Sequence, residues 1–62
     1  MDNYIGTKVW TPEGLRAERV LIMGRAEGLP AGWFRCKCED GQINAIHERN
    51  LYLTRPAALR AA

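Results

Sequence analysis

Hydrophobic and polar residues alternate along much of this chain, and alternation with a period of two is typical of half-buried β-strands. The clearest case is residues 32–48, GWFRCKCEDGQINAIHE, in which Asp40-Gly41 separates two alternating segments. An Asp-Gly pair favours a two-residue type I′ turn, because both central residues of that turn have positive φ. The pattern therefore predicts a β-hairpin in which Phe34 faces His47 and Cys38 faces Ile43.

The two faces of the predicted hairpin differ in character. One is mostly apolar and is expected to cover the core, and the other carries Trp, Arg and Lys in alternation, which is typical of a binding surface. A shift of one residue in the register would exchange the faces. The apolar face holds Phe34, Cys36, Cys38, Ile43, Ala45 and His47, and the other holds Trp33, Arg35, Lys37, Glu39, Gln42, Asn44, Ile46 and Glu48.

Turn residues divide the rest of the chain into further short strands. We expect strands over residues 4–10, 16–25 and 51–54, a type I turn at Thr11-Pro12-Glu13-Gly14, a Gly-rich loop over 24–32 and a 3₁₀ turn over 47–50. The apolar positions of these strands predict the core: Ile5 or Val9, Val20, Ile22, Phe34, Cys36, Cys38, Ile43, Ala45, Leu51 and Leu53.

The length of 62 residues sets the scale of the molecule. A chain of this size forms one domain and buries only about 60% of the surface that its unfolded form exposes. We place the domain at residues 1–54 and an Ala-rich basic tail at residues 55–62, RPAALRAA. The tail is too short for a stable isolated helix, so it is expected to fray unless it docks on the domain.

The order of these loops and turns resembles that of the SH3-like small barrels, a superfamily that includes Tudor and KOW modules. The resemblance covers residues 4–54 and rests on Gly6-Thr7-Lys8-Val9-Trp10, Gly32-Trp33-Phe34 and Asp40-Gly41. It implies an all-β fold, a five-stranded SH3-like barrel with a short C-terminal tail. Many unrelated functions use this barrel, so the resemblance does not name one.

A second resemblance concerns residues 32–36, GWFRC, which are similar to the second half of the plasmid-borne type B dihydrofolate reductases. Those enzymes are small barrels that act as tetramers around a shared pore lined by Val-Gln-Ile-Tyr-Pro. The corresponding residues 43–47 here are INAIH, which contain neither Gln nor Tyr. An oligomeric pore enzyme of this type is the third alternative for the function.

Composition excludes several kinds of catalysis. The chain has no serine, and no pair of carboxylates has a spacing that indicates acid-base chemistry. Cys36 and Cys38 belong to the apolar face, where a free cysteine packs as a small hydrophobe. With His47 they give three soft ligands, whereas a structural zinc site usually has four. We therefore predict no enzyme, no cofactor and no metal site.

The two cysteines also bear on the compartment. They are two residues apart on one strand, with Cα atoms about 7 Å apart, which is at the limit for a disulfide. The longest apolar run, Val20-Leu21-Ile22-Met23, is far too short to span a membrane. These features predict a cytoplasmic protein with reduced thiols and no membrane partner.

The net charge of +2 is too small to indicate nucleic-acid binding by itself. Positive residues gather in residues 16–37 and 49–62, and aromatic with basic residues on a strand suit single-stranded DNA or RNA. We therefore predict a non-enzymatic nucleic-acid-binding module. A protein partner or self-association into a homo-oligomer is the main alternative, because Trp and Arg also dominate protein interfaces. The predicted site residues are Trp33, Arg35, Lys37, Trp10, Arg49 and Arg55.

Overall fold

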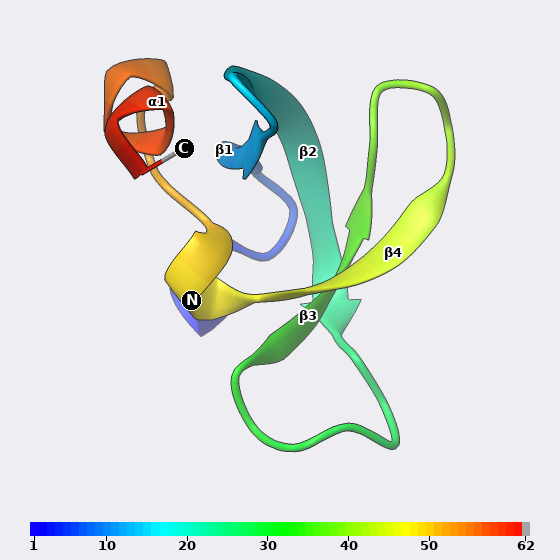
Figure 1. The fold of residues 1–62 in the computed structure, drawn as a ribbon. Helices are drawn as coiled ribbons and strands as arrows, with labels where there is room; N and C mark the ends of the chain where they lie inside the picture. The colour runs from blue at the N-terminus through cyan, green and yellow to red at the C-terminus, as the bar shows by residue number, and fades with distance from the viewer. Residues whose placement is uncertain (62) are drawn as a thin grey trace.

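The computed structural model describes residues 1–61 and shows a mostly β protein. Four antiparallel strands form one open sheet in chain order, and a short helix lies at its β1 end (Figure 1). The prediction of a β fold is therefore confirmed as a mostly β structure, but the sheet of the described residues has four strands and not the predicted five. The elements are η1 (Asp2–Tyr4), β1 (Lys8–Glu13), β2 (Arg16–Arg25), β3 (Trp33–Lys37), β4 (Ile43–His47), η2 (Glu48–Asn50) and α1 (Arg55–Ala61).

The first hairpin turns later than predicted. The strand expected over residues 4–10 begins at Lys8 and continues through Pro12, so the type I turn predicted there is wrong. Only Gly14 and Leu15 connect β1 to β2, and Gly14 has a φ of +59°, as the first central residue of a type II′ turn requires. Pro12 is tolerated because β1 is an edge strand and the Pro12 nitrogen points away from β2.

The second hairpin has a three-residue loop instead of the predicted type I′ turn. Among the described residues no residue other than glycine has a positive φ, which excludes Asp40 from the type I′ conformation. The Gly41 N–H donates to the Cys38 carbonyl at 3.0 Å, and the Cys38 N–H donates to the Gln42 carbonyl at 2.8 Å. This is a type I turn followed by a left-handed glycine, and Gly41 has a φ of +90°.

The longer loop shifts the register by one residue. Phe34 pairs with Ile46, and Lys37 pairs with Ile43. The faces of β3 are those predicted, but the faces of β4 are exchanged, so Ile46 packs against the core and Ile43 points outward. The predicted placement of Ile43, Ala45 and His47 on the core face is wrong.

The core lies on the concave face of the sheet. Its predicted members Val9, Val20, Ile22, Phe34, Cys36 and Leu51 are buried and form one cluster. Ile43, Ala45 and Leu53 were expected in the core and are exposed, while Cys38 is half-buried; of the alternatives Ile5 and Val9, the buried one is Val9. Ile5 is exposed because it follows η1 and precedes the first strand, where no other element covers it.

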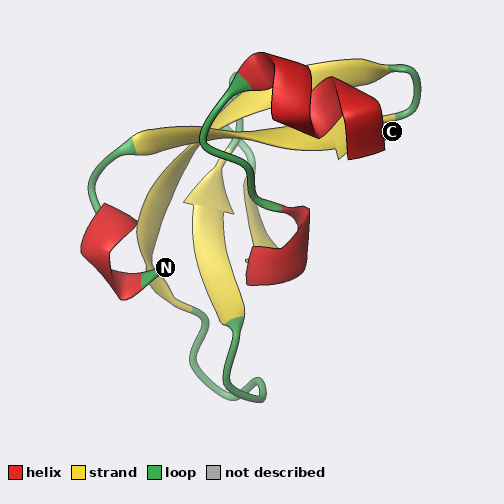
Figure 2. Ribbon diagram, turned by 90° about the vertical axis from the view of Figure 1, so that its left-hand side faces the viewer, coloured by secondary structure: helices red, strands yellow, loops and turns green. Residues whose placement is uncertain are grey.

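The C-terminal segment closes one end of the sheet. The strand expected over residues 51–54 is reduced to a single bridge, in which the Tyr52 N–H and carbonyl both bond to Trp10 of β1. Helix α1 then packs against β1 and β2, and Ala58 is fully buried (Figure 2). The predicted tail is thus helical through Ala61 because it docks, and its last residue, Ala62, lies outside the described residues.

Candidate functional site

Five side chains lie together on the outer face of the sheet, opposite the core. Antiparallel pairing sets Lys8 of β1 opposite Leu21 of β2, and Leu21 opposite Lys37 of β3. Two residues along β1, Trp10 faces Arg19. Residues that pair directly in this way point to the same face, so three cations surround one indole and one leucine.

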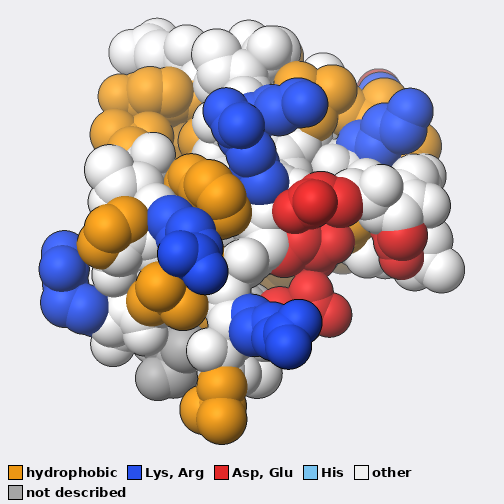
Figure 3. Space-filling model, turned by 90° about the horizontal axis from the view of Figure 1, so that it is seen from above, with side chains coloured by type: hydrophobic (Ala, Val, Ile, Leu, Met, Phe, Trp, Pro, Cys, Tyr) orange, Lys and Arg blue, Asp and Glu red, His pale blue; other side chains and the backbone are white. Residues whose placement is uncertain are grey.

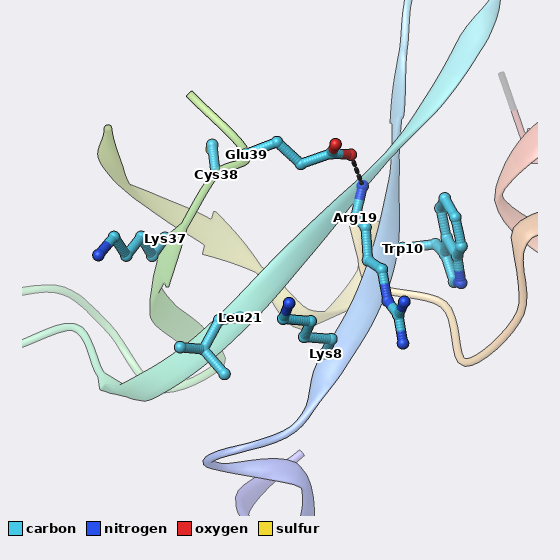
Figure 4. Close-up of a pocket in the computed structure, with 7 residues that line it drawn as sticks. All are labelled: Lys8, Trp10, Arg19, Leu21, Lys37, Cys38 and Glu39. Carbon is cyan, nitrogen blue, oxygen red and sulfur yellow. Dashed lines mark hydrogen bonds between the residues drawn. The ribbon is translucent and has the colours of Figure 1, made fainter. Parts of the chain in front are cut away.

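These side chains line a shallow groove of about 520 Å³, which we call the basic groove (Figure 4). Arg19 extends between Lys8 and Trp10, and its guanidinium carbon lies 5.8 Å from the centroid of the indole ring. Trp10 is half-buried, and its backbone is held by both hydrogen bonds to Tyr52. The groove therefore combines an aromatic surface on a fixed backbone with exposed positive charge. Its lining residues are Lys8, Trp10, Arg19, Leu21, Lys37, Cys38 and Glu39.

Glu39 closes the groove at the tip of the second hairpin. Its carboxylate Oε1 accepts a hydrogen bond from the Arg19 backbone N–H at 3.1 Å. The Glu39 N–H in turn donates to Oε2 of Glu18 at 3.3 Å. These two bonds tie the hairpin tip to β2 and hold the position of the groove wall.

A mainly acidic depression lies beyond this wall, lined by Glu13, Glu18, Glu39 and Asp40 together with Arg16 and Ala17. Figure 3 looks onto this end of the molecule and shows a compact acidic group with Lys and Arg side chains around it. Burial raises the pKa of Glu18, and a hydrogen bond with the Glu13 side chain adds to the effect. Its four carboxylates outnumber the single cation Arg16, so the depression is a less favourable place for a phosphate than the basic groove.

Metal and thiol chemistry have little support at the site. Glu18, Cys38 and Asp40 bring three ligand atoms within 4.8 Å of one another, one fewer than a structural zinc site uses. The set of Cys36, Cys38 and His47 considered from the sequence does not exist, because the register places His47 on the opposite face. Burial raises the pKa of the Cys36 thiol to about 11, with a smaller contribution from Cys38. Such a thiol is not a nucleophile at neutral pH.

The predicted site residues fall in different places. Trp10 and Lys37 line the basic groove, and Arg35 is exposed on the same outer face of β3. Trp33 lies at the other end of β3, where its ring meets His47 edge-on with centroids 5.3 Å apart. Arg49 contacts the same histidine, and its Nε donates to His47 Nδ1 at 3.3 Å.

Arg55 is the first residue of α1; its side chain is exposed, and it does not line the basic groove. The sequence interpretation missed Lys8, Arg19 and Leu21. Arg19 and Leu21 alternate on one strand, and a two-residue turn at Gly14-Leu15 would have placed both opposite Trp10 and Lys8. This turn is the feature of the sequence from which the positions of Arg19 and Leu21 could have been predicted.

Comparisons of the chain with protein-family models, with curated proteins and with solved structures give no match. No helix within residues 1–61 is both long and apolar enough to cross a membrane. The function must therefore follow from the residues of the site and their chemistry.

Proposed function

We propose that this protein is a non-enzymatic binding module for single-stranded DNA or RNA, and that the basic groove is its binding site. The observation that carries the proposal is the meeting of Lys8, Arg19 and Lys37 with the Trp10 indole on one open surface. Single-stranded nucleic acids bind to such surfaces because bases stack on an aromatic ring while phosphates contact cations.

The shape of the groove favours single strands over duplexes. A shallow groove of about 520 Å³ admits an unpaired base edge-on or face-on, whereas a duplex keeps its bases stacked and out of reach of Trp10. The α-helix of the described chain, α1, has only seven residues and packs against β1 and β2, so it is not available to enter a DNA major groove. Sequence preference is expected to be weak, because stacking tolerates every base.

We also infer that the fold is a shortened SH3-like barrel. Strand order, the 3₁₀ turn η2 and the bridge from Tyr52 to β1 together support this plan, with the fifth strand reduced to one residue pair. A binding site on the outer face of the strands is compatible with such a barrel. The free thiols of Cys36 and Cys38 support a reducing, cytoplasmic setting.

Fluorescence of Trp10 provides the first test. In a Trp33→Phe variant, Trp10 is the only tryptophan, so stacking of a short oligothymidylate or oligouridylate should quench its emission. If the three groove cations each contact a phosphate, the slope of log K against log[salt] should be about −2, since each contact contributes roughly −0.7 for single strands. Quenching without salt dependence would contradict the proposal.

Two arginines on β2 give a matched pair of variants. Arg19 points into the basic groove, whereas Arg16 lies three residues away on the opposite face of the same strand. With a dye-labelled oligonucleotide, Arg19→Gln should weaken binding and make the salt slope shallower by about 0.7. Arg16→Gln removes the same charge and should leave the slope unchanged. Equal effects of the two variants would show that only net charge matters and would refute the groove.

A further inference from the structure

The two edges of the sheet are protected very differently. At the β1 edge, the outward N–H and carbonyl of Trp10 are both bonded to Tyr52, at 2.8 and 2.7 Å. Pro12 has no N–H to offer, and α1 packs against the same strand. This edge is therefore closed to any further strand.

The β4 edge is open. Within the described chain, β4 pairs only with β3 (Figure 1). The bonds from Cys38 N–H to the Gln42 carbonyl and from Glu48 N–H to the Gly32 carbonyl enclose the strand at both ends. Because hydrogen-bonded pairs alternate in an antiparallel ladder, Asn44 and Ile46 direct their backbone groups toward β3. The N–H and carbonyl groups of residues 43, 45 and 47 consequently point outward.

This open edge carries none of the residue types that commonly block strand pairing. The sequence of β4, INAIH, contains no lysine, carboxylate or proline, which are the residues that commonly block an edge strand. Ile43 is 51% exposed. A depression of about 400 Å³ lies along the second half of the strand, between Ala45 and His47 on one side and Pro12 and Ala61 on the other. The edge is thus unpaired and exposed over residues 43–45, and the depression leaves space beside residues 45–47.

We infer that β4 pairs antiparallel with β4 of a second copy of this chain, joining the two sheets into one. Pairing along the whole strand sets Ile43 opposite His47 of the second copy and Ala45 opposite its own equivalent. In this register outward residues face only outward residues, so each of these pairs exchanges both of its backbone hydrogen bonds. The interface is a two-fold one, in which each copy presents the same surface.

The charges at the two ends of β4 favour a second copy as the partner. The strand is preceded by the acidic tip Glu39-Asp40 and is followed by Glu48 and then Arg49; continued in the same register, Glu48 falls opposite the uncharged Gln42 of the other copy, and Arg49 opposite Gly41, next to Asp40. An antiparallel arrangement brings the acidic tip of each copy toward Arg49 of the other, so the attraction occurs twice. A parallel arrangement would set like charges side by side.

The pairing has a consequence for the outer face. The row formed by Lys8, Leu21, Lys37 and Ile43 would continue through His47 and Trp33 of the second copy. Trp33, which lies outside the basic groove of its own chain, would then extend the groove of the partner. The dimer itself stands on the open edge and not on the proposed nucleic-acid binding.

Sedimentation equilibrium of the full chain tests the inference directly. We expect a mass twice the 7.0 kDa of one chain at high micromolar to millimolar concentration. Ala45→Pro removes the central outward N–H and should give a folded monomer, because proline is tolerated at an edge strand. Ala45→Val keeps that N–H and should remain dimeric. A wild-type mass of 7.0 kDa at millimolar concentration would overturn the inference, as would unchanged dimerisation of Ala45→Pro.

Amide hydrogen exchange of the wild-type protein gives a second measurement that needs no variant. In a dimer, the amides of Ile43, Ala45 and His47 should become protected as concentration rises, while those of Asn44 and Ile46 are protected at every concentration. Equally fast exchange of the three outward amides at low and high concentration would refute the pairing. Neither measurement involves nucleic acid, so failure of the dimer is distinguishable from failure of the proposed function.

Discussion

Replacing Gly32 with alanine tests how tightly the end of β4 is held. Gly32 has a φ of +98°, which an L-residue adopts only under strain, and a Cβ built there would lie 2.7 Å from Nε2 of His47. The imidazole has little room to retreat. Its ring packs edge-on against Trp33, and its Nδ1 accepts the Arg49 N–H at 3.1 Å, which caps η2.

The expected loss of stability has two parts. Holding a non-glycine residue at positive φ costs about 1–3 kcal/mol. Displacing His47 forfeits the cap of η2, and loss of a helix cap typically costs ~0.5–2 kcal/mol. We therefore expect Gly32→Ala to lower the free energy of unfolding by roughly 1.5–5 kcal/mol, a large share of what a domain this small possesses.

Urea unfolding followed by tryptophan fluorescence measures this loss. Gly41→Ala is the matched control, because Gly41 has a φ of +90° and a Cβ there would meet nothing within 4 Å. The loss of unfolding free energy in Gly41→Ala should therefore reflect the backbone strain alone. Adding His47→Ala should remove the extra cost of Gly32→Ala in a double-mutant cycle. If Gly32→Ala costs no more than Gly41→Ala, the close packing of His47 against Gly32 is refuted.

Three further predictions concern side chains outside the groove centre. Cys38, which is half-buried, should react with a thiol reagent in the native protein well before Cys36, whose pKa is raised to about 11; equal rates would contradict the burial. Glu18→Gln should raise the melting temperature at neutral pH but not at acid pH. The raised pKa of Glu18 means that its protonation stabilises the fold at acid pH, and that this contribution is lost as the pH rises through the folded-state pKa. Thr54→Ala removes the hydroxyl that accepts the Ala57 N–H at 3.3 Å and should cost about 1 kcal/mol, with a loss of helical circular dichroism; an unchanged spectrum and stability would show that the cap is dispensable.

The sequence pattern was a good guide wherever burial decided the structure. The strand predicted over residues 16–25 has those bounds, because the run from Val20 to Met23 is long enough to define it. The alternation of Phe34 and Cys36 likewise identified the buried face of β3, and the polar break after β4 was predicted as the 3₁₀ turn.

The sequence pattern gave the wrong register for the second hairpin, because the residues of its turn fit two turn types. Asp40-Gly41 fits a type I′ turn, but it also fits the last two positions of a type I turn that ends in a left-handed glycine. The second solution sets Ile46 opposite the buried Phe34, deep in the sheet, and leaves Ile43 opposite the exposed Lys37. With the type I′ turn, Ala45 would have pointed into the core instead of Ile46. Local turn propensity did not distinguish the two.

The basic groove was only half predictable for a similar reason. Trp10 and Lys37 were identified from local patterns, but their neighbours come from the pairing of separate strands. Pro12 was assigned to a turn, although it lies within β1. With the turn placed too early, the pairing of Trp10 with Arg19 could not be predicted. Trp33 was placed correctly on the outer face at the start of β3, but alternation alone could not show that the groove forms at the other end of the strand, around Lys37.

An NMR titration of backbone amides with short single-stranded DNA and RNA, at low and moderate salt, tests the proposed function most directly. Binding in the basic groove predicts shifts centred on Lys8, Trp10, Arg19 and Lys37 that shrink as salt is added. The Arg16 end of β2, on the opposite face, should remain unchanged. The absence of shifts at low salt, or shifts confined to the acidic hairpin tip, would contradict the assignment of this groove to nucleic acid.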